Sequence, residues 1–264
     1  MSDKSNSPVK ADISASLNAD ISDVSNNVLS NLCIPSSKQL GKALGNIAGL
    51  IHTSTLPIKL INQYAKKNYE KLEEKLQDIP EENIREVEPE IGIPIMEKIA
   101  YTSNDDLAEL YTSLLANASQ KDKIHLVHPG FINKINSMAP DEAKILELFR
   151  KKNNIAYIKF RAQNDNKEGL DISDKLTSFE NEINIDPNTF QLHLENLVSL
   201  SLINDCEGSF LTQEGIYDSL ENIYPQFKKS VEENQYGQYN KLNVRRSYYE
   251  LSKVGKTFLD ACII

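Results

Sequence analysis

Apolar residues recur every three or four positions over most of the chain between residues 40 and 152, a spacing that predicts successive amphipathic helices. We expect helices over Leu40–Thr55 and Pro57–Leu76, then from Pro89 to about Tyr101. Later helices are predicted to begin at Ser103 or Asn104, at His128-Pro129 and at Ala139-Pro140. Their inward-facing residues should be Leu107, Leu110, Tyr111, Leu114, Leu115, Phe131, Ile132, Ile135, Ile145, Leu146 and Phe149.

The pattern changes after Lys152. Ile155–Phe160 has the composition of a strand, and Asp186-Pro187 begins a helix that should run to about Leu200. Short strands are predicted at Leu202-Ile203 and Phe210-Leu211, around a turn at Glu207-Gly208. Leu211-Thr212 and Leu251-Ser252 each resemble a strand end whose hydroxyl caps the next helix, and the polar stretch 225–243 resembles a long wing or loop.

These patterns predict a mainly α protein. A helical hairpin and a compact helical core should be followed by a small α+β, winged-helix-like C-terminal module. The expected segments are a disordered N-terminal tail (1–36), a hairpin that is rich in small and charged residues (37–88), a helical core (89–152) and the winged-helix-like module (153–264).

Composition narrows the class of protein. The net charge of −9 disfavours general binding to phosphate backbones. The cysteines Cys33, Cys206 and Cys262 form no paired motif, which suits a reducing compartment. Met1–Ser30 lacks the apolar region of a secretory signal, and no uninterrupted apolar run reaches the roughly 18 residues of a membrane span. We therefore expect a cytoplasmic protein, with peripheral attachment at the inner membrane face as the alternative.

Gly41, Gly45 and Gly49 lie four residues apart in an otherwise apolar stretch. In a helix this spacing makes a smooth face for close contact with another helix, within this protein, in an oligomer or at a membrane. Lysines at 42 and 59 interrupt the stretch, and each would cost about 2.5–3.5 kcal/mol at the centre of a bilayer. Packing against protein is the first interpretation, and attachment to a membrane surface is the second.

A winged helix reads DNA with polar or basic side chains of its second helix. The predicted helix from Pro187 to Leu200 has no Lys or Arg, and it offers Asn188, Gln191 and His193 beside Glu195. The candidate contacts to nucleic acid or a protein partner are Asn188, Gln191, Arg245, Arg246, Lys253 and Lys256. Because the helix lacks basic charge, a protein partner or self-association is expected before nucleic acid.

Sequence motifs for catalysis are absent. The chain has no Walker A sequence, no GxGxxG and no HExxH. Asp122, His125 and His128 are the only candidate metal ligands, but their spacing fits no helix face, and His128 is better explained as a cap beside Pro129. We assign no catalytic residue, no metal and no cofactor, and we expect that the protein is not an enzyme.

Several segments together resemble the Abi-alpha family, bacterial proteins named for abortive infection, a phage-defence response. The matching residues are Asp105-Asp106-Leu107, Leu114–Ala118, Val127–Phe131, Pro140–Ala143 and Tyr249–Cys262. The resemblance runs from about Gly41 to the C-terminus. It implies helical proteins that end in a winged-helix-like portion, a role in restricting phage growth, and no established catalytic residues.

The resulting hypothesis is a non-enzymatic interaction or effector protein of phage defence, which would act at the membrane if the Gly41-Gly45-Gly49 helix attaches there. The alternatives are a winged-helix DNA-binding regulator and an enzyme whose site has no recognised motif.

Overall fold

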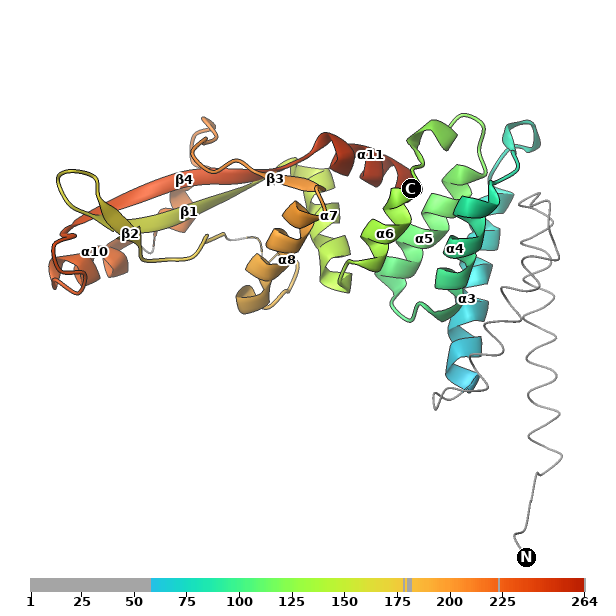
Figure 1. Cartoon of the computed structure of the whole chain (residues 1–264), viewed down its shortest axis with the longest axis horizontal. Helices are drawn as coiled ribbons and strands as arrows, with labels where there is room; N and C mark the ends of the chain where they lie inside the picture. Colours follow the sequence, from blue (N-terminus) through green and yellow to red (C-terminus); the bar gives the residue numbers. More distant parts are fainter. Residues whose placement is uncertain (1–57, 178, 180–181, 223, 264) are drawn as a thin grey trace, which may run out of the picture. The chain divides into compact units, whose positions relative to one another are not determined.

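The computed structural model describes residues 58–263 except 178, 180–181 and 223 (Figure 1). The predicted helix over Leu40–Thr55 and the glycines Gly41, Gly45 and Gly49 lie outside these residues. Contacts within the chain define two units. The first unit runs through Ser137 and includes the residues from Phe258 onward, and the second unit is Met138–Thr257.

The first unit is helical, as the apolar periodicity predicts. Its elements are α3 (Ile58–Gln77), the 3₁₀ turn η1 (Glu81–Asn83), α4 (Pro89–Tyr101), α5 (Asp105–Ala118), the 3₁₀ turn η2 (Ile124–Leu126) and α6 (Gly130–Asn136). The predicted start and end of α4 are confirmed. The predicted inward residues of α5 and α6 are buried, except Leu107, which is half-buried.

Polar side chains close the ends of these helices. Asn104 is the cap of α5, because its side chain accepts hydrogen bonds of 3.0 Å from the backbone N–H groups of Asp106 and Leu107. The buried Asn68 of α3 donates to the carbonyl oxygens of Ile99 (2.9 Å) and Thr102 (2.8 Å) at the end of α4. Backbone groups that the helices leave unpaired are therefore satisfied inside the unit.

The second unit combines helices with a sheet. Its elements are α7 (Pro140–Lys152), β1 (Asn154–Gln163), β2 (Gly169–Asp171), α8 (Pro187–Ser199), β3 (Ile203–Asp205), α9 (Asp218–Glu221), α10 (Tyr224–Glu232), β4 (Lys241–Leu251) and the first residues of α11 (Lys253–Cys262). The four strands lie in the order β2-β1-β4-β3, and every pair is antiparallel. A helical part followed by a small α+β part is therefore confirmed.

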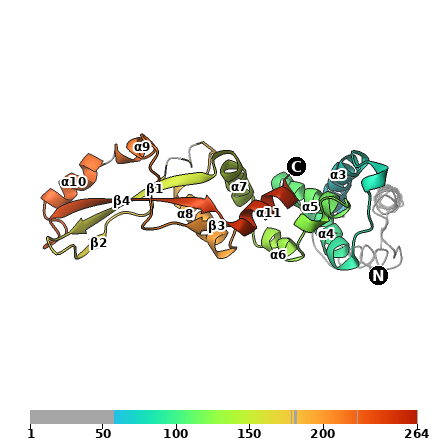
Figure 2. The same cartoon turned by 90° about the horizontal axis from the view of Figure 1, so that it is seen from above.

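The long β1–β4 ribbon has two different faces because side chains alternate along a strand. One face carries Ala156, Ile158 and Phe160, which form an apolar cluster with Tyr217 and Leu220. In Figure 2, α9 and α10 lie on one side of this ribbon and α8 lies on the other. Phe227 of α10 stacks on Phe160 with ring centroids 4.3 Å apart. The opposite face carries Tyr157, Lys159 and Arg161 and holds the candidate site.

A buried carboxylate joins α7 to α8. Glu142 is 3% exposed and accepts hydrogen bonds from the Asn196 side chain (2.8 Å) and the Ala139 backbone N–H (3.2 Å). His193 places its Nδ1 3.2 Å from the same carboxylate. These contacts give the oxygens of this buried side chain hydrogen-bond partners, which a polar group inside a protein needs.

Two predictions in this unit were wrong. Phe210-Leu211 forms no strand and Thr212 caps no helix, because Leu211 packs against the apolar cluster and β3 pairs with β4 instead. The stretch 225–243 is not a long wing or loop. It contains most of α10, whose Tyr224 and Phe227 pack against the same cluster, and the first residues of β4.

The predicted cap at Ser252 is confirmed. Its Oγ accepts a 2.8 Å hydrogen bond from the backbone N–H of Gly255 at the start of α11. A Cβ on Gly255 would lie 1.9 Å from the carbonyl oxygen of Leu202. Glycine is required here because the helix approaches another backbone too closely for any side chain.

Candidate interaction site

The candidate site begins with the positive charges on one face of the β1–β4 ribbon. Lys159 and Arg161 share this face with Tyr157, because the three residues alternate along β1. Arg245 of β4 lies directly opposite Lys159 in the strand register. Like charges at such close positions destabilise a sheet unless acidic groups lie beside them.

A bulge next to β1 brings part of the compensating charge. Asp171 pairs with Arg161, and the next bridge joins Leu176 to Ile158. Residues 172–175 therefore lie opposite only residues 159–160, and the ladder is interrupted. The hydroxyl of Ser173 accepts a 2.8 Å hydrogen bond from the backbone N–H of Phe160, in place of a backbone carbonyl. Bulges of this kind re-aim side chains, here those of Ser173, Asp174 and Lys175.

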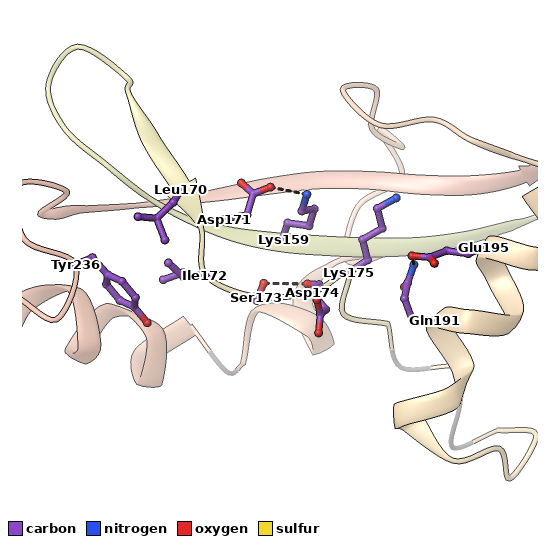
Figure 3. Close-up of a pocket in the computed structure, with 10 residues that line it drawn as sticks. All are labelled: Lys159, Leu170, Asp171, Ile172, Ser173, Asp174, Lys175, Gln191, Glu195 and Tyr236. Atoms are coloured by element: carbon purple, nitrogen blue, oxygen red, sulfur yellow. Dashed lines mark hydrogen bonds and ion pairs between the residues drawn. The ribbon is translucent and has the colours of Figure 1, made fainter.

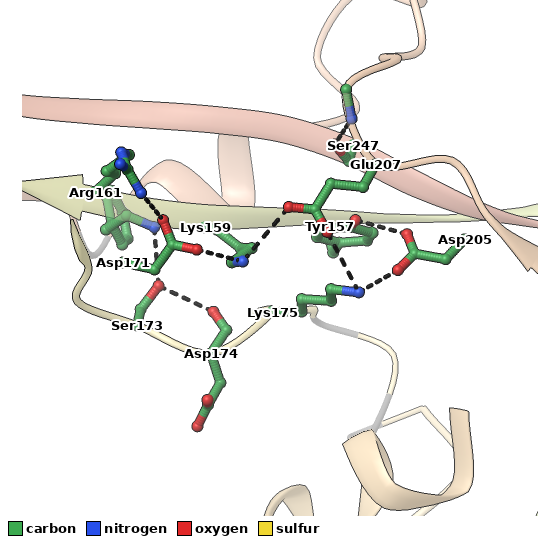
Figure 4. A network of polar contacts seen from close by, with 12 residues as sticks. Tyr157, Lys159, Arg161, Asp171, Ser173, Asp174, Lys175, Asp205, Glu207 and Ser247 are labelled. Carbon is green, nitrogen blue, oxygen red and sulfur yellow. Dashed lines mark hydrogen bonds and ion pairs between the residues drawn. The ribbon is translucent and has the colours of Figure 1, made fainter. Parts of the chain in front are cut away.

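The charged side chains form one connected row (Figure 4). Asp171 binds Lys159 (2.5 Å) and Arg161 (3.0 Å). Glu207 lies between Lys159 (3.5 Å) and Lys175 (3.9 Å). Lys175 also binds Asp205, which accepts a 2.7 Å hydrogen bond from the hydroxyl of the buried Tyr157. The members of this charged row are Tyr157, Lys159, Arg161, Asp171, Lys175, Asp205 and Glu207.

Pairing determines the ionisation of the row. The hydrogen bond from Lys159, and then that from Arg161, hold the pKa of Asp171 below its ordinary value against the opposing effect of burial. Burial disfavours the charge of Lys175, but its hydrogen bond to Asp205 and nearby groups raise its pKa overall. Burial and the Asp205 carboxylate raise the pKa of Tyr157. Asp171 and Lys175 therefore stay charged near neutrality while Tyr157 stays protonated, which suits binding and structural roles better than proton transfer.

A cavity of about 560 Å³ lies beside this row (Figure 3). Lys159, Asp171 and Lys175 line it together with Gln191 and Glu195 of α8. Leu170, Ile172 and Tyr236 also line the cavity. The lining mixes both signs of charge with a few apolar groups, so it offers polar contacts without a dominant charge.

The helix α8 uses part of its predicted contact surface internally. Gln191 donates from Nε2 to the hydroxyl of Tyr249 (3.0 Å) and to Glu195 (3.4 Å), and its buried Oε1 has no hydrogen-bond partner among the described residues. Asn188 lies in the first turn of α8. The exposed residues of α8 include Thr189, Leu192, Glu195 and Ser199, with Leu192 63% exposed. This exposed surface is partly apolar and carries an acidic group.

The predicted basic contacts lie on two elements. Arg245 and Arg246 are exposed neighbours in β4, so their side chains point to opposite faces of the ribbon. Arg246 binds Glu221 at 2.6 Å and lies over the Tyr217 ring, whereas Arg245 lies on the face of the charged row. Lys253 and Lys256 are exposed in the first turns of α11. Among the described residues, no hydrogen bond or ion pair joins Arg245 or Arg246 to Lys253 or Lys256, and the role of these four residues in binding stays a prediction.

His128, considered as a metal ligand, caps a helix. Its Nδ1 accepts a 2.9 Å hydrogen bond from the backbone N–H of Gly130 at the start of α6. Across the described part of the chain, no three His, Cys, Asp or Glu side chains are grouped so that they could hold a metal ion. None of the described helices is both long and apolar enough to cross a membrane.

Sequence reasoning missed the charged row. Its signal was present in Asn154–Gln163, where Tyr157, Lys159 and Arg161 alternate with the apolar Ala156, Ile158 and Phe160. Such alternation predicts a strand with one polar face. The acidic partners Asp205 and Glu207 lie more than 40 residues later in the chain, and no local pattern connects them to β1.

Comparisons with known proteins identify one family. The family described as abortive infection alpha matches residues 61–262. No curated protein matches the chain. One solved structure, that of an uncharacterized protein from the marine bacterium Alcanivorax borkumensis SK2, matches with 18% identity and a TM-score of 0.34, covering 50% of this chain and 90% of that one.

Proposed function

Because the chain belongs to the abortive infection alpha family, we propose that it restricts phage growth as an interaction protein rather than as an enzyme. Abortive infection is the role that the family description suggests. The family match supports the role in restricting phage growth. The pairing of ionisable groups in the charged row supports action by interaction rather than by catalysis.

The residues that carry the family resemblance support a non-enzymatic role. Asn117 binds carbonyl oxygens at the end of α11, His128 caps α6, and Gly255 allows α11 to approach Leu202. Each of these residues has a structural explanation that requires no substrate. Because these residues of the chain serve packing and helix ends, we infer that it acts through its surfaces.

The second unit is proposed to be an enlarged winged helix. The order α7, β1, α8, β3, β4, with β4 between β1 and β3, supports this proposal, and within the described residues α8 alone stands where that fold has two helices. The additions are β2, α9 and α10. A protein partner is favoured over DNA, because the exposed part of α8 carries Leu192 and Glu195 and has no basic residue.

A filter-binding assay with duplex DNA at low salt separates these two partners. Retention by the intact protein that is lost in an Arg245→Ala/Arg246→Ala double variant would favour the DNA-binding regulator instead. Weak retention that the double variant leaves unchanged is the expected result.

Action at a membrane surface through Gly41, Gly45 and Gly49 is a separate part of the proposal, supported by their spacing in the sequence. Flotation of the intact protein with anionic liposomes at low salt tests it. A triple variant with leucine at the three glycines is the matched comparison, and absence of the intact protein from the floated fraction contradicts membrane attachment.

Phage challenge tests the function as a whole. Cells that express the intact gene should reduce the plating efficiency of at least some phages in a broad panel, relative to cells that carry an empty vector. Deletion of residues 40–61 and deletion of residues 153–257, which keeps the part of α11 that belongs to the first unit, then ask which part acts on the cell and which part recognises the phage. If the intact gene protects against no phage in the panel, the proposed function is wrong.

A further inference from the structure

The strand β4 is covered unevenly by its neighbours. It pairs with β1 from Lys241 to Glu250, but with β3 only from Tyr249 to Leu251 (Figure 1). A single further backbone bond, from the N–H of Cys206 to the carbonyl oxygen of Tyr248, extends this pairing. Toward its C-terminal end this edge is flanked by the segment 208–218, in which Gly208 donates to the Ser247 hydroxyl and Tyr217 donates to the Ser247 carbonyl oxygen. Within the described residues, no strand pairs with the remaining edge from Lys241 to Arg246.

The direction of the free backbone groups follows from the ladder. The carbonyl oxygen of Tyr248 and the N–H of Ser252 form their hydrogen bonds on the β3 side of β4. Backbone groups alternate in direction along a strand, so those of every second residue before Tyr248 point to the same side. Leu242, Val244 and Arg246 therefore direct their N–H groups away from β1.

The far side of β1 gives an independent check on this direction. Val244 lies opposite Phe160, whose N–H and carbonyl groups bind Ser173 and Ile172 on the side away from β4. In an antiparallel pair, the backbone N–H and carbonyl groups of two directly opposite residues either bond to each other or both point away from the pair. The N–H and carbonyl of Val244 hence point outward, and among the described residues they have no hydrogen-bond partner.

An uncovered edge of this kind is a template for another strand. The charges beside it determine which strand fits. Arg245 is exposed on the face of the charged row, where its positive charge reaches Asp171 in addition to the charges of Lys159 and Arg161, and among the described residues it forms no ion pair. Lys241, at the end of the edge, binds the highly exposed Asp165.

A second copy of this chain fits the edge poorly. Antiparallel pairing of two β4 edges about Val244 would bring Arg246 of one copy beside Leu242 of the other and gather Lys241, Arg245 and Arg246 from both copies. In that register Arg245 of one copy lies opposite Asn243 and diagonal to Arg245 of the other copy, and no carboxylate across the pair offsets this repulsion, so self-pairing is disfavoured. An acidic guest strand removes this repulsion.

The side-chain positions define the pattern of the guest. A residue opposite Arg245 has its side chain on the same face, within reach of the guanidinium, and a carboxylate there completes an ion pair. Guest residues beside Leu242 and Val244 direct their side chains to the other face, on which the side chains of Leu242 and Val244 pack against the apolar cluster. The fitting segment therefore alternates acidic and apolar residues.

We propose that the β4 edge from Lys241 to Arg246 binds an extended protein segment with alternating acidic and apolar residues by adding it to the sheet as a fifth strand. This inference deepens the proposed function, since it names the class of partner that the second unit recognises. Backbone hydrogen bonds to Leu242 and Val244 provide the attachment, and Arg245 selects an acidic sequence.

The test uses the intact protein and a fluorescein-labelled peptide of four Val-Glu repeats. Binding is measured by fluorescence anisotropy, with a peptide of four Val-Lys repeats as the charge control. A Val-Glu peptide N-methylated at alternate residues is the backbone control. The Val-Glu peptide is expected to bind, and the two control peptides are expected to bind at least about tenfold more weakly.

Two variants separate the backbone from the charge. Val244→Pro removes an outward N–H without removing any bond to β1, and Arg245→Glu leaves the backbone intact while it reverses the charge. Each should weaken binding by about tenfold or more, and Lys151→Glu, at an exposed position of α7, should change it by less than about twofold. Circular dichroism verifies that each variant is folded.

Several outcomes overturn the inference. They are no binding of the Val-Glu peptide, equal binding of the Val-Lys peptide, and unchanged binding by folded Val244→Pro and Arg245→Glu. A dimer in sedimentation that Val244→Pro dissociates would instead identify a second copy as the occupant.

Phage challenge separates the two proposals. If the intact gene protects and Arg245→Glu protects equally, the edge is not the recognition surface and the defence role stands. If peptide binding follows the prediction but no phage is restricted, the defence role fails alone.

Discussion

The side chain of Asn117 in α5 donates a 2.9 Å hydrogen bond to the carbonyl oxygen of Ala261 in α11, 144 residues later in the chain. A second, longer contact of 3.4 Å reaches the carbonyl oxygen of Asp260. Asn117 is 1% exposed, so these carbonyl groups at the end of α11 receive their partner inside the first unit. A helix leaves its last carbonyl oxygens unpaired, and a buried asparagine supplies the missing donor.

Replacement of this donor should destabilise the protein. Asn117→Ala removes both hydrogen bonds and leaves carbonyl oxygens of α11 without a partner, so we expect the free energy of unfolding to fall by about 1–3 kcal/mol. Urea denaturation followed by circular dichroism measures the change. Asn133→Ala, at an exposed position of α6, is the matched control and should shift stability by less than about 0.5 kcal/mol. Equal effects of the two changes would contradict the capping role.

The glycine at position 255 should tolerate no side chain. A Cβ there would lie 1.9 Å from the carbonyl oxygen and 2.9 Å from the carbonyl carbon of Leu202, and backbone atoms cannot move aside cheaply. Gly255→Ala should therefore lower the free energy of unfolding by about 1–3 kcal/mol, although alanine is the better helix former. Thermal unfolding measures the effect, with Lys256→Ala at the exposed neighbouring position as the control. A stabilised Gly255→Ala variant would show that α11 does not approach Leu202 so closely.

The contributions of Lys175 and Asp205 to the free energy of unfolding should depend on each other, because the two side chains form an ion pair. Lys175→Met leaves Asp205 with the Tyr157 hydroxyl but without its cation, so we expect a loss of about 1–3 kcal/mol in the free energy of unfolding. The double variant Lys175→Met/Asp205→Asn should recover part of that loss, because no unpaired charge remains. Lys151→Met is the exposed control. If the losses in the free energy of unfolding caused by Lys175→Met and by Asp205→Asn simply add in the double variant, the two residues are not coupled.

Stability of the first unit should depend on pH through Glu109. Burial opposes the charge of this carboxylate, but hydrogen bonds from Lys75 and Lys71 lower its pKa below the ordinary value of 4.5. A lowered folded-state pKa contributes stability that is present above pH 4.5 and is lost as the pH falls through the folded value. Glu109→Gln should therefore destabilise the protein near pH 7 by about 0.5–1 kcal/mol, a figure reduced by the partial exposure of the group.

The difference between the wild type and Glu109→Gln should shrink as the pH falls below the ordinary value. Urea denaturation at several pH values measures it, with Glu86→Gln at an exposed position as the control. A difference that stays constant down to the lowest pH would mean that the charge of Glu109 is not the stabilising feature.

Much of the helical architecture could be predicted because its signals are local. Pro89 and Pro140 lie at the first positions of α4 and α7, and Asn104 caps α5. The apolar spacing within each helix then identified buried residues such as Leu114 and Phe149. A cap or a helical stripe involves residues within a few positions of one another, so a single sequence contains the whole signal.

The second unit was harder to predict because its pairing partners are distant in sequence. The sequence around Phe210-Leu211 suggested a hairpin with Leu202-Ile203, but β3 pairs with β4, almost 50 residues away. The polar character of the stretch 225–243 obscured α10, in which only Tyr224, Phe227 and Val231 provide apolar side chains. Local propensity could not decide between a wing and a covering helix, because the apolar face of β1 that α10 covers lies more than 60 residues earlier.

By itself, the sequence determined the positions of most described helices, the family and the absence of recognised catalytic motifs. The tertiary structure alone decided which charges meet in the row of Lys159, Lys175 and Asp205, and which edge of β4 stays uncovered. The physical reason is the range of the interactions. Helix caps and apolar stripes form between near neighbours, whereas strand register, bulges and ion pairs between strands depend on where the whole chain brings distant residues together.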